Sequence, residues 1–346
     1  MSSLKYRAIG AAFDILSLSR ITRLLRRFGQ CRGLIFTLHR VLPEAPAAFA
    51  PNAILQITPD FLDTFLTRAR ALGFDLVSLD EAIARIEAET PGRPFITLTF
   101  DDAYRDNLTH ALPVLKKHKC PFTLYVPTAF IEGEGEIWWQ ALEDIIAANE
   151  TLLLGSRHPD GRMQTATQAQ KNQAFNDIYW QMRDMPESER VSFIRDLAMD
   201  HDYDLYAQCR NLIMTWKELD IFVREPLCTL GAHTVHHYEL AKLSEAGARR
   251  EIADSLTTLE AKTGTPPRHL SYPIGAIRSA GEREFALAAE LGLRSGVTTR
   301  PGGLYAKDST RLHALPRVSL NGLYQKAHYV DVFLTGALFS LMGRRG

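Results

Sequence analysis

Two groups of residues in this chain could together hold a metal ion and move a proton. Asp101 and Asp102 directly follow an apolar, β-rich run that begins at Phe95. Neighbouring residues at a strand end point in different directions, so one aspartate can bind a metal while the other accepts a proton. Far downstream, His233 and His237 are spaced i, i+4 and would share one face if the chain turned helically there. With one aspartate they make three protein ligands and leave a fourth position open for water, which predicts a metal-dependent hydrolase.

Three short boxes follow one another along the chain: Thr99-Phe-Asp-Asp-Ala103, Gly231-Ala-His-Thr-Val-His-His237 and Leu270-Ser-Tyr-Pro-Ile-Gly275. In sequence and in order they resemble the first three motifs of the polysaccharide deacetylases (carbohydrate esterase family 4, the nodulation-B homology family). Asp-Asp at a strand end is by itself more often a helix cap or a solvated turn, but three boxes in the right order favour the family. The resemblance covers approximately residues 33–322, with a long insert.

The resemblance implies a metal centre. Asp102, His233 and His237 would bind a divalent metal, with zinc as the first choice and cobalt or nickel as replacements. His236 also has helical spacing to His233, so the spacing alone does not exclude it as a ligand. The family pattern skips that position and favours His237.

The resemblance also implies that Asp101 is the general base, which would take a proton from the attacking water. The third motif implies that the backbone N–H of Ile274 stabilises a tetrahedral oxyanion, although the same residues also suit a simple turn after a strand. The chain departs from the family at Ser271, where many members have an arginine that positions the catalytic aspartate. Arg317 or Arg268 could supply that charge, although an arginine is more often at the surface.

The general acid has two candidates. His39 lies near the end of the apolar run Leu34–Val41, which resembles the N-terminal strand of circularly rearranged family members, where an early histidine takes this role. The usual late Leu-x-His motif is matched only poorly by His313 and its neighbours. Protonated His39 could give its proton to a leaving amine, but a lone histidine is about as often only satisfied by a neighbour.

The composition excludes other classes of function. Forty basic and forty acidic residues cancel, so no global field attracts nucleic acid, and no zinc-finger or aromatic-basic pattern is present. Four scattered cysteines, Cys31, Cys120, Cys209 and Cys228, have no metal or redox spacing and suit free thiols in a reducing compartment. A hydrophobic share of 46% is typical of a packed soluble core.

The hydrophobic pattern between residues 33 and 322 predicts an α/β fold. Strands are expected at 33–42, 74–79, 121–126, 228–231, 269–272 and 295–298 and up to residue 101, with helices at 59–72, 80–88 and 107–118. This alternation predicts a parallel sheet, and the resemblance implies a distorted, incomplete (β/α) barrel. The pattern of residues 131–216 predicts a mostly helical insertion that covers the carboxyl ends of the strands, where the active site is expected. Amphipathic segments at 1–32 and 323–346 flank the barrel.

The terminal segments predict either packing on the barrel or contact with a membrane surface. The first 32 residues carry seven basic side chains and one acidic side chain, Asp14. Arginines alternate with an apolar stripe, Ile21, Leu24, Leu25 and Phe28, as in a helix that lies in a membrane interface. The segment lacks a secretory signal pattern, so we expect a cytoplasmic protein with peripheral contact to the anionic inner leaflet. The apolar tail from Tyr329 is too short to span a bilayer, so we expect it either to pack on the N-terminal helix or to join that helix at a membrane surface.

The sequence therefore predicts a metal-dependent hydrolase that removes N-acetyl groups from amino sugars of an oligosaccharide, polysaccharide or lipid-linked glycan. An O-acetyl esterase or a deformylase is a close alternative, because the same centre attacks any small acyl carbonyl. A catalytically weak glycan-binding pseudoenzyme is a third, because Ser271 breaks one motif. The sugar, its linkage and the oligomeric state do not follow from the residues.

Overall fold

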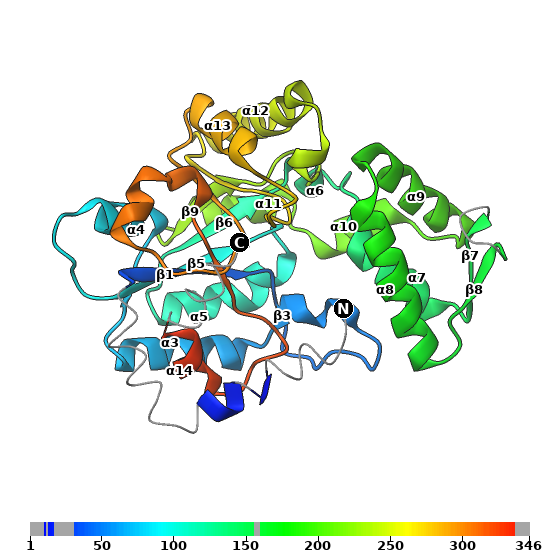
Figure 1. The fold of residues 1–346 in the computed structure, drawn as a ribbon, viewed down its shortest axis with the longest axis horizontal. Helices are drawn as coiled ribbons and strands as arrows, with labels where there is room; N and C mark the ends of the chain where they lie inside the picture. The colour runs from blue at the N-terminus through cyan, green and yellow to red at the C-terminus, as the bar shows by residue number, and fades with distance from the viewer. Residues whose placement is uncertain (1–9, 12, 17–30, 156–159, 336–346) are drawn as a thin grey trace.

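Eight parallel strands form one curled sheet in the computed structural model, which describes residues 10–11, 13–16, 31–155 and 160–335 (Figure 1). Seven of these strands follow the order β11-β10-β9-β6-β5-β1-β12, and β4 pairs with β5. The strands are β1 (Gly33–Leu38), β4 (Asp75–Leu76), β5 (Phe95–Phe100), β6 (Phe122–Val126), β9 (Cys228–Ala232), β10 (His269–Ser271), β11 (Ser295–Val297) and β12 (Val318–Ser319).

The central strands are buried along their whole length. All six residues of β1 and all six of β5 are buried, as expected for a parallel sheet that is covered on both faces. Phe36 of β1 pairs in register with Leu98 of β5 and with Val318 of β12. Because the strands are parallel, their carboxyl ends lie along one edge of the sheet, where α/β barrels place their chemistry.

The barrel is not closed by a continuous ladder. Strands β11 and β12 stand at the two ends of the order. Among the described residues, these two ends are connected by an isolated bridge between Val297 and Leu315 and by a hydrogen bond from the Arg317 N–H to the Arg300 carbonyl (3.1 Å). The predicted parallel sheet of an incomplete (β/α) barrel is therefore confirmed.

Helices cover the outside of the sheet (Figure 1). They are α3 (Pro59–Ala71), α4 (Leu79–Glu87), α5 (Leu112–Lys117), α6 (Thr128–Ile131), α11 (Trp216–Val223), α12 (Glu245–Thr263), α13 (Glu282–Glu290) and α14 (Tyr329–Phe333). Thr58 caps α3, because its hydroxyl oxygen accepts a hydrogen bond from the Phe61 N–H (3.1 Å).

Two elements differ from the sequence prediction for local reasons. The strand expected at 74–79 shortens to β4, because Ser78 caps a helix that already starts at Leu79. The helix expected at 107–118 begins as a π-helical turn, Asn107–Ala111, before α5. In this turn the Asn107 amide donates a hydrogen bond to the carbonyl of His39 (2.7 Å). The turn therefore fixes the chain that follows β1 beside the chain that follows β5.

A helical arm leaves the barrel after β6 and returns to it before β9 (Figure 1). It contains α7 (Trp138–Ala148), the antiparallel hairpin β7 (Thr151–Leu153) and β8 (Arg162–Gln164), α8 (Gln168–Asp184), α9 (Glu187–Asp200) and α10 (Leu205–Leu212). Ile178, Met182 and Ile194 are among its buried side chains. The arm occupies the part of the chain for which the sequence predicts a helical insertion.

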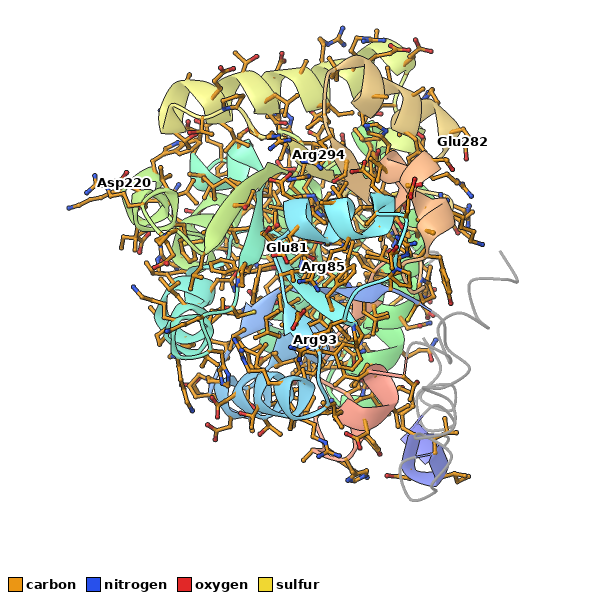
Figure 2. All side chains as sticks on the ribbon, turned by 90° about the vertical axis from the view of Figure 1, so that its left-hand side faces the viewer. Glu81, Arg85, Arg93, Asp220, Glu282 and Arg294 are labelled. Atoms are coloured by element: carbon orange, nitrogen blue, oxygen red, sulfur yellow. The ribbon has the colours of Figure 1, made fainter. Side chains whose placement is uncertain are left out.

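Charged side chains gather around α4 (Figure 2). Arg85 pairs with Asp75 (2.9 Å) and Glu81 (2.6 Å), and Arg294 pairs with Asp80 (3.0 Å). Asp75 opens β4 and Arg294 immediately precedes β11, so this cluster lies at the amino ends of the strands. Each pair is partly exposed and stabilises the fold by only about 0–1 kcal/mol. The cluster connects α4 to the amino ends of the strands, away from the carboxyl ends where the site residues lie.

The described parts of the two termini pack against each other. The Phe13 ring is buried against the rings of Tyr324, Tyr329 and Phe333, with centroid distances of 5.1, 5.4 and 5.2 Å. Next to it, the Asp14 carboxylate accepts a hydrogen bond from the Tyr329 hydroxyl (2.7 Å). These residues follow the first alternative for the C-terminal tail, which is packing on the N-terminal helix.

The stripe expected at the membrane surface, Ile21, Leu24, Leu25 and Phe28, lies outside the described residues, as does the tail from residue 336 onwards. Within the part of the chain that the structure describes, no helix is both long and apolar enough to cross a membrane.

The packing of Phe13 predicts a loss of stability on its removal. Phe13→Ala should lower the free energy of unfolding in urea by about 3 kcal/mol, because it removes a ring buried among three others. Ile15→Ala is the matched control on the same helix, since Ile15 is 68% exposed and its truncation should change stability by less than about 0.5 kcal/mol. Equal stabilities of the two variants would contradict this packing.

Candidate active site and metal centre

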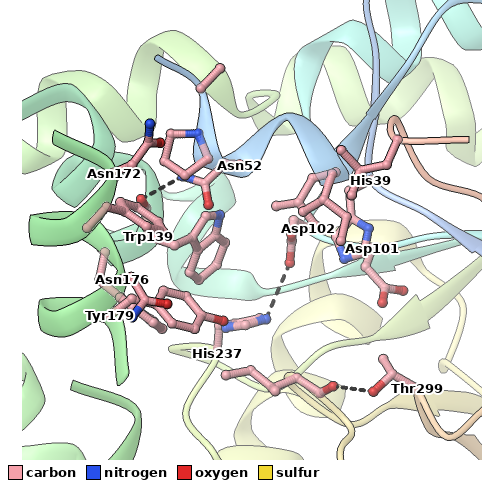
Figure 3. Close-up of a pocket in the computed structure, with 18 of the residues that line it drawn as sticks. His39, Asn52, Asp101, Asp102, Trp139, Asn172, Asn176, Tyr179, His237 and Thr299 are labelled. Atoms are coloured by element: carbon pink, nitrogen blue, oxygen red, sulfur yellow. Dashed lines mark hydrogen bonds and ion pairs between the residues drawn. The ribbon is translucent and has the colours of Figure 1, made fainter. Parts of the chain in front are cut away.

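Three predicted ligands meet at the carboxyl edge of the sheet. The Nε2 atoms of His233 and His237 lie 3.4 and 3.5 Å from Oδ1 of Asp102. Figure 3 shows the contact between His237 and Asp102. One ligand atom from each residue lies within 4.8 Å of the others, and all three side chains are buried. Asp102 Oδ1 accepts no hydrogen bond from the described residues. A buried carboxylate oxygen without a donor, facing two imidazole nitrogens, fits the donor set of a metal site.

The tautomer of His233 suits metal binding. Its Nδ1 lies 2.6 Å from the carbonyl oxygen of Ser271, which can only accept a hydrogen bond, so Nδ1 carries the proton. The lone pair is then on Nε2, the atom that faces Asp102. Burial acts to lower the pKa of His233, but the nearby carboxylates of Asp102 and Asp101 outweigh it and raise the pKa above its ordinary value. A metal ion would replace that extra proton.

His237 is held by packing. Its ring lies 4.9 Å from that of Trp139 and 5.8 Å from that of Phe130, measured between centroids. Burial among these rings lowers the pKa of His237 to about 3, so the imidazole is neutral. A neutral imidazole has the lone pair that a metal ligand needs.

The prediction that a helical turn brings His233 and His237 onto one face is wrong, because the chain is not helical there. Residues 233–237 form a loop after β9, in which Thr234 and His237 have φ of 64° and 60°. The Thr234 hydroxyl accepts a hydrogen bond from the His237 N–H (3.1 Å) and closes this loop. Asp102 also has a positive φ, of 72°, which turns its side chain away from that of Asp101. Such conformations cost on the order of 1–3 kcal/mol each in non-glycine residues and are concentrated at functional sites.

His236 is outside the metal centre. Its side chain is 48% exposed, and its Nδ1 lies 2.7 Å from a carboxylate oxygen of Glu251. The other Glu251 oxygen accepts the backbone N–H of His236 (2.9 Å). This side chain therefore points away from Asp102 and supports the loop from outside.

Arg317 supplies the charge that Ser271 lacks. Its guanidinium forms a bidentate pair with Asp101, with Nη1–Oδ1 at 2.8 Å and Nη2–Oδ2 at 2.7 Å. It also donates to the carbonyl of Thr298 (2.9 Å) and to the hydroxyls of Thr99 (3.0 Å) and Ser271 (2.9 Å). These contacts use all five N–H donors of an arginine. The small side chain of Ser271 leaves space for this guanidinium, which belongs to the residue directly before β12.

This ion pair fixes the protonation state of Asp101. Burial acts to raise the pKa of the carboxyl group, but Arg317 outweighs it and holds the pKa well below its usual range. Oδ2 accepts weak hydrogen bonds from Thr37 (3.4 Å) and Ser271 (3.3 Å) in addition to Arg317. Among the described residues, Arg317 is the one donor to Oδ1. That oxygen therefore keeps a lone pair for a water proton.

The remaining candidates fall into two groups. His39 and Ile274 line the same cavity as the two aspartates, and the Ile274 N–H donates to no acceptor in the described part of the chain. His313 lies elsewhere, with its Nε2 2.7 Å from the carbonyl of Leu293. Arg268 pairs with Asp80 at the amino ends of the strands.

The cavity above these residues has a volume of about 940 Å³. The barrel mouth forms one side of it, and the arm forms the other through α7 and α8 (Figure 3). The 3-10 helix η1 (Pro51–Leu55) contributes Asn52, whose amide donates to the carbonyl of Trp139 (2.7 Å). Sequence reasoning missed Asn52, Trp139 and the α8 residues, because no motif marks them and the fold alone brings them here.

The donor set fits a small divalent transition metal. Two imidazole nitrogens and one carboxylate oxygen leave a fourth tetrahedral position open, as in catalytic zinc sites. The same donors accept cobalt or nickel, so the residues do not select zinc by themselves.

The sequence model of the polysaccharide deacetylase family matches residues 88–196 and 198–296. No curated protein matches the chain. Among solved structures, a Streptococcus pyogenes deacetylase, PplD, in complex with acetate is similar, with 19% identity and a TM-score of 0.56 over 88% of this chain and 97% of that one. IcaB from Ammonifex degensii has 18% identity and a TM-score of 0.51 over 86% and 97% of the two chains. A polysaccharide deacetylase from Bacillus cereus has 14% identity and a TM-score of 0.54 over 88% and 68%.

The ligand geometry makes a prediction about neighbouring histidines. His237→Ala should remove most of the bound zinc from the purified protein, because it removes one of three ligands. His236→Ala, one residue away, should keep one zinc ion per chain. Elemental analysis gives the metal content, and circular dichroism checks that both variants are folded. Stoichiometric zinc in His237→Ala, or loss of zinc in His236→Ala, would refute the assignment.

The contacts of Arg317 predict a coupled effect on stability. Arg317→Met should lower the free energy of unfolding by about 3–5 kcal/mol, because it leaves the Asp101 carboxylate buried without its partner. In an Asp101→Asn background the same substitution should cost less than half as much, because no charge is then stranded.

Urea titrations of the single and double variants measure this coupling. Arg268→Ala, at the other arginine considered from the sequence, should change stability by less than about 0.5 kcal/mol. Equal losses for Arg317→Met in the two backgrounds would contradict the coupling.

Proposed function

Because the chain belongs to the polysaccharide deacetylase family and is a hydrolase that acts on amide bonds, we propose that it removes N-acetyl groups from amino sugars with the help of a divalent metal. The substrate is an oligosaccharide, a polysaccharide or a lipid-linked glycan. Zinc is the proposed metal, held by Asp102, His233 and His237. One observation carries the proposal: a buried aspartate locked by Arg317 lies next to these three ligands at the mouth of a cavity.

Asp101 acts as the proton acceptor. When bound, the metal supplies Lewis-acid polarisation and acidifies a water molecule. Arg317 keeps Asp101 ionised and fixes its orientation, at the price of weak basicity, because a strongly lowered pKa makes a poor proton acceptor. A bound metal would offset that weakness by lowering the pKa of the water. Oδ1 of Asp101, which has a lone pair to spare, takes the proton as the water oxygen attacks the acetyl carbon.

Two other groups complete the reaction. The Ile274 N–H, which is free to donate, stabilises the negative charge that develops on the carbonyl oxygen. His39 gives a proton to the sugar nitrogen as the C–N bond breaks, which releases acetate and a free amine. An amide depends on this proton more than an ester does, because an amine anion is a poor leaving group. The intact set argues against a pseudoenzyme.

Location at the cytoplasmic face of a membrane stays a prediction. The residues on which it depends, Arg20, Arg23 and Arg27 with their apolar stripe, lie outside the described part of the chain.

The function is tested by acetate release from three kinds of substrate: N-acetylglucosamine oligomers, lipid-linked N-acetylated sugars and O-acetylated xylan. We expect release from N-acetylated substrates, loss of activity after chelation, and recovery when zinc is added back. Release from O-acetylated xylan alone, or activity that survives complete removal of metal, would refute the proposal.

The two aspartates are separated in the same assay. Asp101→Asn should keep its zinc and lose about 10²–10⁴-fold in rate, because the attacking water then has no proton acceptor. Asp102→Asn is the matched variant and should lose zinc as well as activity. Near-normal turnover in Asp101→Asn, or equal zinc loss in both variants, would count against this division of labour.

A further inference from the structure

The loop between the two histidine ligands is held by a carboxylate that the proposed chemistry does not use. Glu251 lies in the second turn of α12, and its side chain is only 11% exposed. Its Oε2 atom accepts hydrogen bonds from the backbone N–H groups of Val235 (3.1 Å) and His236 (2.9 Å), and its Oε1 atom lies 2.7 Å from Nδ1 of His236. Both oxygens are therefore engaged by the residues that lie between His233 and His237.

The partners of Glu251 in the described part of the chain all belong to this loop. Its ion pair there is with the ring of His236, and it contacts no lysine or arginine. A carboxylate is rarely buried without a lysine or arginine, because the loss of its hydration is costly. Two backbone N–H groups and one ring nitrogen replace that water here. The hydrogen-bonding capacity of this side chain is thus directed at the loop and not at the packing of α12.

The loop needs support, because its backbone conformation is unfavourable for its residue types. Thr234 and His237 have φ of 64° and 60°, and a positive φ is a genuine outlier for a β-branched residue such as threonine. Conformations of this kind persist only when the surrounding structure enforces them. Relaxation of the loop would move the His237 ring away from Asp102.

The opposite side of the loop is held by the start of α6. The Thr128 N–H donates to the carbonyl of Thr234 (3.2 Å), and the Ala129 N–H donates to the carbonyl of Val235 (3.0 Å). Carbonyl groups of the loop thus face α6, and its N–H groups face α12. Without Glu251, two backbone N–H groups would lose their acceptor and the loop would be held from one side only.

We propose that Glu251 is a positioning residue for the metal centre. It fixes the backbone between the two histidines, so that their rings already face Asp102 before an ion binds. A ligand set that is preorganised in this way binds more tightly, because less conformational freedom is lost on binding. Glu251 itself is not among the candidate ligands and does not line the cavity. This inference rests on the metal centre of the proposed function and adds a residue that sets its affinity.

Zinc affinity tests this role, measured on metal-free protein by competition with a chromophoric chelator. Glu251→Ala should bind zinc about 10–100-fold more weakly than the wild type, the usual effect of removing a group that orients metal ligands from outside. Glu251→Gln should stay within about threefold of the wild type, because its amide oxygen can replace Oε2 and accept both backbone N–H groups. This rescue would show that the contacts with the loop matter and the charge does not.

Two further variants serve as controls. Glu260→Ala removes an exposed glutamate from the same helix and should leave the zinc affinity unchanged. His236→Ala removes the ring contact with Oε1 but keeps both backbone N–H groups, so its affinity should fall by less than about threefold, as expected for a half-exposed pair. If circular dichroism shows that Glu251→Ala is unfolded, Glu251→Asp takes its place. Its carboxylate is one methylene shorter, and zinc binding should weaken by roughly fivefold or more.

The assay needs no substrate, which separates this inference from the proposed reaction. Equal affinities of the wild type and Glu251→Ala, or equal losses in Glu251→Gln and Glu251→Ala, would overturn the positioning role. Zinc binding that depends on Glu251, without acetate release, would support this role and refute the deacetylase reaction. Zinc-dependent acetate release with equal affinities of the wild type and Glu251→Ala would do the reverse. Absence of zinc binding by the wild type would overturn both.

Discussion

The buried pair between Arg317 and Asp101 is the interaction on which the rest of the site depends. Arg317 follows β11 in the chain and donates to Thr298 just after that strand, to Asp101 after β5 and to Ser271 at the end of β10. Because Arg317 immediately precedes β12, its bond to Thr298 joins the two ends of the strand order, β12 and β11, which no continuous ladder connects. Burial of this charge is tolerable because every N–H has an acceptor and the carboxylate is bound at both oxygens. The same contacts keep the proposed base, Asp101, ionised and fix its orientation. One side chain therefore both connects the ends of the sheet and positions the proposed base.

Positive φ angles in the backbone arrange the three candidate metal ligands around this ion pair. Asp102 diverges from Asp101 because its φ is positive, and His237 turns back toward Asp102 for the same reason. Two further contacts hold the imidazole rings in place. Trp139 packs against the ring of His237, and the carbonyl of Ser271 accepts a hydrogen bond from the ring of His233. The arm continues the arrangement outwards, because α7 supplies that tryptophan and α8 supplies the opposite wall of the cavity. The candidate ligands and the cavity wall are thus connected by one continuous set of contacts.

The sequence predicted the parts of this site that local patterns encode. Strand ends identified Asp101, Asp102 and His39, and the incomplete parallel barrel followed from the alternation of strands and helices together with the family resemblance. The expected helical turn at the histidines failed because left-handed conformations at Thr234 and His237 leave no pattern in residue types. Arg317 could not be chosen over Arg268, since its partner is 216 positions away and the family match ends at residue 296. The α8 wall was missed because amides on a helix surface have no signature until the fold turns them toward a cavity.

The central claim is that the adjacent aspartates do different work, one as metal ligand and one as base. Diffraction from zinc-loaded crystals, recorded on both sides of the zinc absorption edge, tests it most directly. We predict one anomalous peak at about 2.0–2.2 Å from Nε2 of His233, Nε2 of His237 and Oδ1 of Asp102, with Asp101 still paired to Arg317 and outside the coordination sphere. A peak bound by Asp101, or the absence of a peak between the two histidines, would contradict the account.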